Sequence, residues 1–136
     1  MKIEKVNPVI ENNELFNVTG KLSVESGSAD SSVITVYQLP GDSIIKKLND
    51  ITQFGLQFEY NKQYHIDFSK EGYQTKRILV DTSLPDSVEN KFPPFQILVS
   101  LIKAQASSEK SDIDIAGKIF YNQKINNFDS EVFFNN

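Results

Sequence analysis

The sequence predicts an all-β fold, an antiparallel Greek-key β-sandwich of about seven or eight strands. Three observations lead to this prediction. Several short segments alternate apolar and polar residues, as strands with one buried face do. The apolar residues include ten Phe and five Tyr beside many β-branched residues, and both kinds favour strands. Turn residues separate these segments at short intervals, and no segment has a convincing helical period.

The chain of 136 residues suits a single domain with a packed core. Its hydrophobic content of 39% and charged content of 24% exclude global disorder. We divide the chain into an N-terminal arm (1–14), a sandwich (15–103), and a linker with a C-terminal segment (104–136) that holds one further possible strand.

The first two strands are predicted from alternation and from β-branched residues. Phe16 and every second residue up to Val24 are apolar or glycine, so the strand over 16–25 has one buried face. The serine-rich stretch 26–32 is rich in turn residues and ends this strand. Residues 33–39 are rich in β-branched side chains and form the second strand.

The next two strands differ in strength. A turn at 40–41 precedes a weaker strand over 43–48. Lys46 and Lys47 within it are expected to protect an exposed sheet edge. Alternation over 54–60 predicts another half-buried strand.

A hairpin is predicted around Gly72. Residues 64–68 alternate, residues 69–72 form a turn, and residues 73–81 return. Gly72 is well placed to take a positive φ in a glycine bulge. Tyr73 is expected to lay its ring on the edge of the sandwich, with its hydroxyl reaching water or the backbone.

The last third of the chain contains one strongly apolar strand and a less regular end. Prolines mark a long loop over 82–94. Residues 95–102 are nearly continuously apolar, which predicts a central strand. A small, polar linker over 104–111 precedes one more possible strand over 113–121, and the remaining residues have no clear period.

The order and spacing of these motifs resemble the carboxypeptidase regulatory-like domains of bacteria. The resemblance covers residues 15–103, and its motifs are Gly20-Lys21-Leu22, Val33-Ile34-Thr35-Val36, Gly55-Leu56-Gln57-Phe58, Tyr64-His65-Ile66-Asp67-Phe68, Gly72-Tyr73 and Ile97-Leu98-Val99-Ser100-Leu101. The motif Phe-Ser-Lys-x-Gly-Tyr at 68–73 is similar to sequences found in envelope proteins of Bacteroidetes. The resemblance implies a transthyretin-like (prealbumin-like) sandwich.

Together, the strand pattern and the resemblance predict a non-catalytic structural or interaction module of a bacterial cell-envelope or secreted protein. Its partners would be neighbouring domains or envelope proteins. Two alternatives remain: a module that binds a glycan or a peptide, and an accessory domain of a peptidase. We assign no ligand-binding residues from the sequence.

Composition excludes several kinds of chemistry. The net charge of −4 lacks the basic excess of nucleic-acid binders. The absence of cysteine excludes disulfides, thiolate nucleophiles, cysteine-ligated zinc and iron–sulfur clusters. No apolar run is long enough for a signal peptide or a membrane span. The chain is therefore either cytoplasmic or a piece of an exported envelope, periplasmic or secreted protein.

The titratable residues predict no catalytic, cofactor-binding or metal site, and hence no enzyme. His65 is the only histidine, and it lies on the polar face of its predicted strand, as a half-exposed surface histidine does. Asp112 and Asp114 could bind calcium together with Asp81 or Glu109. We prefer a solvated pair of carboxylates beside a loop.

Surface residues offer three further candidates, each with a simpler explanation that we prefer. The five tyrosines could stack on sugar rings, but core or rim packing explains them better; they are Tyr37, Tyr60, Tyr64, Tyr73 and Tyr121. A cluster of Lys70, Lys76 and Arg77 could contact an anion, but solvated strand edges explain it better. Asn17-Val18-Thr19 matches a glycosylation acceptor, and so short a match is nearly uninformative.

Overall fold

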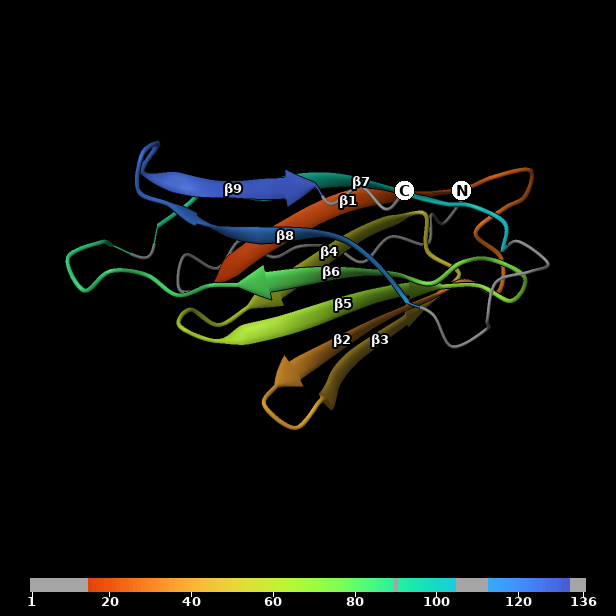
Figure 1. Ribbon diagram of the computed structural model, residues 1–136, viewed down its shortest axis with the longest axis horizontal. Coiled ribbons are helices and arrows are strands. Elements are labelled where there is room, and N and C mark those ends of the chain that lie inside the picture. Colours follow the sequence, from red (N-terminus) through yellow and green to blue (C-terminus); the bar gives the residue numbers. More distant parts are fainter. Residues whose placement is uncertain (1–14, 90, 105–112, 133–136) are drawn as a thin grey trace, which may run out of the picture.

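The computed structural model describes residues 15–89, 91–104 and 113–132. These residues form nine strands and no helix (Figure 1). The strands are β1 (Phe16–Val24), β2 (Val33–Leu39), β3 (Ser43–Asn49), β4 (Gln53–Phe58), β5 (Gln63–Ser69), β6 (Lys76–Asp81), β7 (Phe95–Leu101), β8 (Asp114–Asn122) and β9 (Asn127–Val132). The predicted arm over 1–14 lies outside the described residues.

The nine strands form two sheets, which confirms the predicted all-β class. One sheet has three strands in the order β4-β1-β7, and the other has six in the order β3-β2-β5-β6-β8-β9. The prediction of purely antiparallel sheets is wrong for two pairs, because β1 pairs with β7 and β6 pairs with β8 in parallel. In both pairs the chain crosses to another part of the fold between the two strands, and such a crossover allows parallel pairing where a tight hairpin does not.

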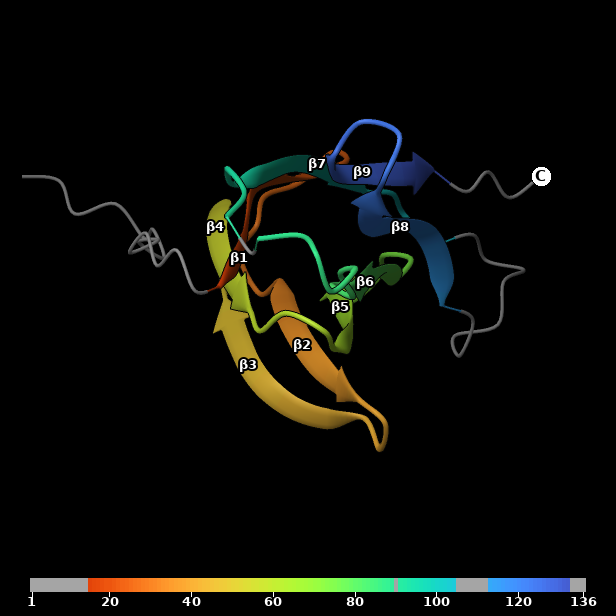
Figure 2. The same cartoon turned by 90° about the vertical axis from the view of Figure 1, so that its left-hand side faces the viewer.

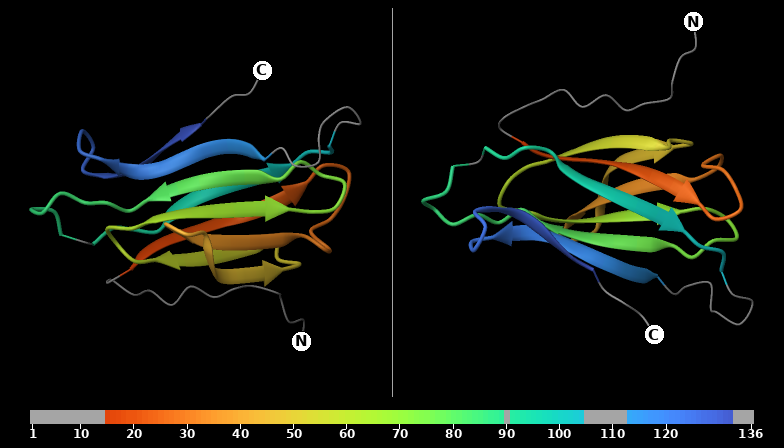
Figure 3. Two further views of the ribbon diagram at one scale, coloured as in Figure 1. Left: turned by 60° about the horizontal axis from the view of Figure 1, so that its bottom comes forward. Right: turned by 90° about the horizontal axis from the view of Figure 1, so that it is seen from above.

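The two sheets face each other across a common core. Seen from the end, the six-stranded sheet curves from β3 round to β9, and the three-stranded sheet lies over its open side (Figure 2). The views in Figure 3 show that the strands of both sheets run along the long axis of the molecule. The described residues contain no helix long and apolar enough to cross a membrane.

The core is filled by the side chains that alternation predicted to point inward. Sixteen buried residues form one hydrophobic cluster, and aromatic rings from both sheets meet within it. Phe54 of β4 lies 5.5 Å from Phe68 of β5, measured between ring centroids. Phe58 lies 4.8 Å from Tyr64 in the same way. These contacts across the sheets are the main apolar burial that holds the layers together.

Gly20 of β1 lies in close contact with both of its neighbours in the three-stranded sheet, β7 and β4. A Cβ at this position would lie 2.5 Å from the carbonyl oxygen of Ile97 and 2.6 Å from the ring of Phe54. Both distances are shorter than any ordinary contact, so a side chain here would push β7 or Phe54 away. Glycine thus has a packing role in the first strand.

The hairpin around Gly72 has the predicted chemistry. Gly72 has a φ of +85°, which confirms the positive φ predicted for it. The Tyr73 hydroxyl donates a hydrogen bond of 2.7 Å to the carbonyl oxygen of Glu25, which confirms that it reaches the backbone. The returning strand β6 begins at Lys76, three residues later than predicted.

The predictions for the edge strands gave mixed results. The lysine pair does lie on an edge strand, because β3 ends the six-stranded sheet. The prediction that residues 95–102 form a central strand is wrong, because β7 ends the three-stranded sheet. Its Leu98 points away from the core and is 83% exposed. Strand β9 was not predicted; it extends the six-stranded sheet beyond β8.

Candidate functional site

A cleft opens between β7 and the strands β8 and β9. Its volume is about 420 Å³, within the range of pockets that bind small ligands. The three-stranded sheet ends at β7, whereas the six-stranded sheet continues through β8 to β9. Part of the inner face of the larger sheet is therefore not covered by a strand among the described residues.

The walls and floor of this cleft are mostly apolar. Ile97 and Val99 of β7 form one side, and Ile119 of β8 lies on the floor. Gly117 also lines the floor, and a Cβ there would lie 2.7 Å from the carbonyl oxygen of Glu131. The close approach of β8 and β9 thus requires glycine at this position. Because glycine has no side chain, nothing projects into the cleft there. Val132, at the end of β9, is 61% exposed at the rim.

The backbone of β7 points alternately toward β1 and toward the cleft. The carbonyl oxygen of Leu101 accepts a hydrogen bond of 2.9 Å from the amide of Glu25, which follows β1. In a strand, the backbone groups of successive residues point to opposite sides. The amide and carbonyl groups of Gln96, Leu98 and Ser100 therefore face the open edge, where no strand of the described residues pairs with them.

Just beyond β7, the same edge is already paired. The Gln74 amide donates a hydrogen bond of 2.9 Å to the carbonyl oxygen of Ile102. Tyr73 and Lys103 form an isolated antiparallel bridge beside it. The open edge over 96–100 therefore continues a line of backbone pairing that the chain itself begins.

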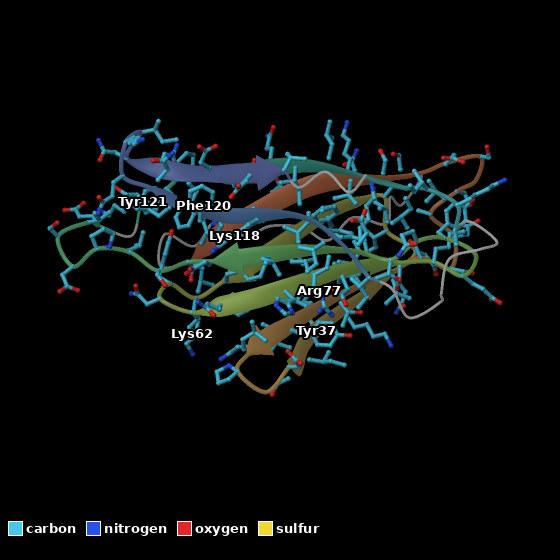
Figure 4. All side chains as sticks on the ribbon, in the orientation of Figure 1. Tyr37, Lys62, Arg77, Lys118, Phe120 and Tyr121 are labelled. Carbon is cyan, nitrogen blue, oxygen red and sulfur yellow. The ribbon has the colours of Figure 1, made fainter. Side chains whose placement is uncertain are left out.

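The outer face of the six-stranded sheet carries a second, smaller hollow of about 160 Å³. His65 lines it, together with Leu39, Leu79 and Lys118. In Figure 4, Tyr37, Arg77 and Lys118 mark three strands of this sheet. His65 is the histidine of this hollow. Among the described contacts, no nucleophilic side chain lies within hydrogen-bond distance of its imidazole, so His65 has no partner there for acid–base chemistry.

An ion pair lies next to this hollow. Arg77 donates from Nε to Oδ1 of Asp67 at 2.7 Å and from Nη2 to Oδ2 at 2.9 Å. The two residues are directly opposite each other on β5 and β6. This hydrogen bonding raises the pKa of Arg77 above its ordinary value. The two charges neutralise each other across β5 and β6, and their pairing helps to fix the register of these two strands.

The pKa of His65 is lowered from its ordinary value. Partial burial is the main cause, because it disfavours the charged imidazolium. The positive charge of Arg77 lowers the pKa further, whereas Asp42 and Asp67 act in the opposite direction. The folded protein therefore favours neutral His65.

We expect acid to destabilise the protein partly through His65. Because the folded pKa is lowered, the stability that neutral His65 contributes is present above its unfolded pKa of about 6.5 and is lost as the pH falls below it. In urea unfolding between about pH 7.5 and pH 5, the wild type should lose more stability than His65→Gln. Parallel pH profiles for the two proteins would contradict this expectation.

The tyrosines do not form one sugar-binding patch. Tyr64 is 2% exposed and lies in the core, while Tyr37 lies on the opposite face of the same sheet. Tyr60 packs against Phe16, and Tyr121 packs against Phe128. The preference for core or rim packing is confirmed for Tyr60, Tyr64 and Tyr121.

The two suggested calcium ligands that the structure describes, Asp81 and Asp114, lie apart. Asp112 and Glu109 lie outside the described residues. Asp114 is opposite Lys76 at the start of β6, whereas Asp81 ends that strand. The two ends of β6 are five residues of extended chain apart, which is roughly 17 Å. The prediction of a calcium site that contains both Asp81 and Asp114 is therefore wrong. Among the described residues, no three His, Asp or Glu side chains gather as metal ligands do.

The basic residues are dispersed. Lys70 donates to the carbonyl oxygen of Asp30, and Lys46 and Lys47 lie on β3. The explanation of Arg77 as a residue of a solvated edge is wrong, because β6 is an interior strand and Arg77 pairs with Asp67. Asn17 is 4% exposed, which leaves the matched glycosylation asparagine inaccessible in the folded domain.

Searches with protein-family models and among curated proteins found no match to this chain. The cleft beside β7 is the larger of the two hollows described above, and we take it as the candidate site. Sequence reasoning missed it because its walls come from strands far apart in the chain. One signal was present: the apolar run over 95–102 is richer than an edge strand needs.

Proposed function

We propose that this protein is a non-catalytic interaction module that joins polypeptide chains through an open strand edge. The observation that supports it is the edge strand β7, whose sequence is that of a central strand. Exposed edges present unpaired amide and carbonyl groups, and proteins normally protect them with charged residues, prolines or bulges. None of these devices occurs within β7, although β3 carries two lysines.

The cleft adds apolar surface to this edge. A partner that pairs with β7 would also cover the floor around Ile119 and the exposed end of β9. Backbone hydrogen bonds would give affinity, and the apolar floor would select side chains. A site with this combination suits binding to another polypeptide better than it suits a reaction.

The cellular setting is also a proposal. The Greek-key, prealbumin-like arrangement and the likeness to bacterial envelope domains rest on the motifs over 15–103. They support a role in the cell envelope or in a secreted protein, where small sandwich domains space and connect neighbouring domains. The partners would then be adjoining domains or envelope proteins.

Site-specific photo-crosslinking in the producing cells tests the proposed function. A photoreactive amino acid at Leu98, which is 83% exposed, should crosslink to one defined polypeptide identified by mass spectrometry. The matched position is Ile44, which is 59% exposed on the edge strand β3 that carries the lysine pair. It should give no such product.

Equal crosslinking from both positions would argue against a specific interaction edge. A hydrolytic or transfer activity that a single point substitution abolishes would overturn the non-catalytic assignment.

A further inference from the structure

We infer that the cleft between β7 and β9 binds a single extended segment of another polypeptide chain. The segment runs antiparallel to β7 and carries apolar side chains at every second residue. This inference rests on the proposed function and names the form of its partner.

The sequence of β7 first indicates an additional strand beside it. Five of its seven residues are apolar, and Phe95, Ile97, Val99 and Leu101 are the inward-facing set. Leu98 breaks the alternation on the outward face, which is otherwise lined by Gln96 and Ser100. Near-continuous apolar runs are typical of strands in the interior of a sheet that are buried on both faces. Strand β7 instead lies at the end of its sheet and pairs only with β1 among the described strands.

The backbone gives the pairing its direction. Gln96, Leu98 and Ser100 turn their amide and carbonyl groups to the cleft, so a new strand has three residues to pair with. The bridge between Tyr73 and Lys103 shows that the chain already pairs on this side in the antiparallel sense. A segment that continues this line would also be antiparallel, and antiparallel pairs are slightly more stable per residue.

The cleft floor sets the chemistry of the inward side chains. They would meet Ile78, Ile97, Val99 and Ile119, with Gly117 leaving space between them. Lys76, Lys118 and Glu131 also line the cleft, but a charged group placed against the apolar side chains of the floor would lose its hydration at high cost. The outward side chains would lie in line with Gln96 and Ser100, where polar residues fit. Alternating apolar and polar residues satisfy both faces.

The second wall favours one strand rather than the edge of a second folded copy. Strand β9 bounds the cleft on the side opposite β7, and it is itself an edge strand. Strand β9 and strand β7 run in roughly the same direction along the long axis of the molecule. The arrow of β9 is clear in Figure 1 and that of β7 in Figure 3. A single antiparallel segment could therefore lie between them. A second copy would bring β1 and β4 with its own β7, and these strands would meet β9.

The test is peptide binding by fluorescence anisotropy with the full chain. The probe is a labelled peptide about as long as β7, in which valine alternates with threonine and lysines at both ends keep it soluble. Its control has the same length with a central valine replaced by proline, which removes a backbone donor. We expect saturable binding of the first peptide and at least about tenfold weaker binding of the second.

Two pairs of protein variants locate the site. Leu98→Pro removes the amide that faces the cleft, whereas Leu98→Ala keeps it and removes only an outward side chain. Ser130→Phe fills the cleft from an exposed position, whereas Ser43→Phe adds the same ring on the distant edge strand β3. Leu98→Pro and Ser130→Phe should each weaken binding by at least about tenfold, and their controls by less than about threefold. Circular dichroism spectra that match the wild type show that each variant is folded.

Three results would overturn the inference. Undiminished binding to both Leu98→Pro and Ser130→Phe would place the peptide elsewhere. No binding of the alternating peptide, while Leu98 still crosslinks to a partner in cells, would leave the interaction module standing and replace the extended segment with a folded surface. A dimer of the unliganded protein that Leu98→Pro converts to a monomer would assign the edge to a second copy.

Discussion

Replacing Phe16 with alanine is expected to reduce the free energy of unfolding by about 3–5 kcal/mol. Phe16 is fully buried, and its ring stacks on that of Phe128 with centroids 4.0 Å apart and an interplanar angle of 24°. Phe16 begins β1 in the smaller sheet, and Phe128 lies on β9 in the larger one. The stack thus joins the two layers, and its loss would leave a cavity at their junction. Domains of this size have about 5–15 kcal/mol of stability in total.

Equilibrium urea unfolding of the variant and the wild type measures this loss. Phe16→Leu is the matched control, because it keeps most of the apolar volume and should cost less than about 2 kcal/mol. A loss below about 1 kcal/mol for Phe16→Ala would mean that the ring is not the tie between the sheets that its burial indicates.

The same aromatic cluster explains where the cleft begins. Phe128 also contacts Phe92 and Tyr121 edge-on, at 5.1 Å and 5.9 Å between centroids. These rings hold the first half of β9 against the core. The second half of β9, from Ser130 to Val132, is exposed and borders the cleft. One strand therefore anchors the domain at one end and forms a wall of the candidate site at the other.

Most strands could be predicted because period-two alternation is a local signal. Strand β9 could not, because its inward residues are Phe128, Ser130 and Val132. Ser130 breaks the apolar alternation, and it does so where the inward face borders the open cleft instead of the core. The irregular pattern thus has the same physical cause as the cleft.

The order of strands within the sheets is a long-range property that alternation does not contain. The parallel partner of β7 is β1, which lies more than seventy residues earlier, as the pairing of Leu22 with Val99 shows. The sequence of residues 95–102 carries no signal that this strand has a neighbouring strand on one side only. The apolar run predicted a strand correctly and its central position wrongly, because β7 has an apolar sequence but lies at an open edge.

One part of the outer face could have been predicted. Asp67 and Arg77 each lie five residues from Gly72, on opposite sides of the turn. A hairpin centred on this glycine places them opposite each other, so their ion pair follows from the turn position and the opposite charges. The hollow beside His65 has no comparable signal, because Lys118 reaches it from a strand that pairs with β6 only after a long crossover.

Thr82→Val is expected to reduce the free energy of unfolding by about 2–4 kcal/mol. Thr82 follows β6 and is fully buried. Its hydroxyl donates to the carbonyl oxygen of Glu59 at 2.7 Å and accepts from the amide of Lys62 at 3.1 Å. It therefore fixes the turn between β4 and β5. Valine has the same shape but no hydroxyl, so both backbone groups would lose a partner at a buried position.

Hydrogen exchange separates this loss from a general weakening of the fold. In Thr82→Val, the Lys62 amide should exchange faster, because its acceptor is gone. The Asn61 amide should remain protected against local opening, because it donates to the backbone carbonyl of Thr82 at 2.9 Å, which the substitution keeps. Thr82→Ser retains the hydroxyl and should cost only about 1 kcal/mol. A loss of about 2 kcal/mol or more for the serine variant, with less than about 1 kcal/mol for the valine variant, would show that the methyl group, and not the hydroxyl, stabilises this turn.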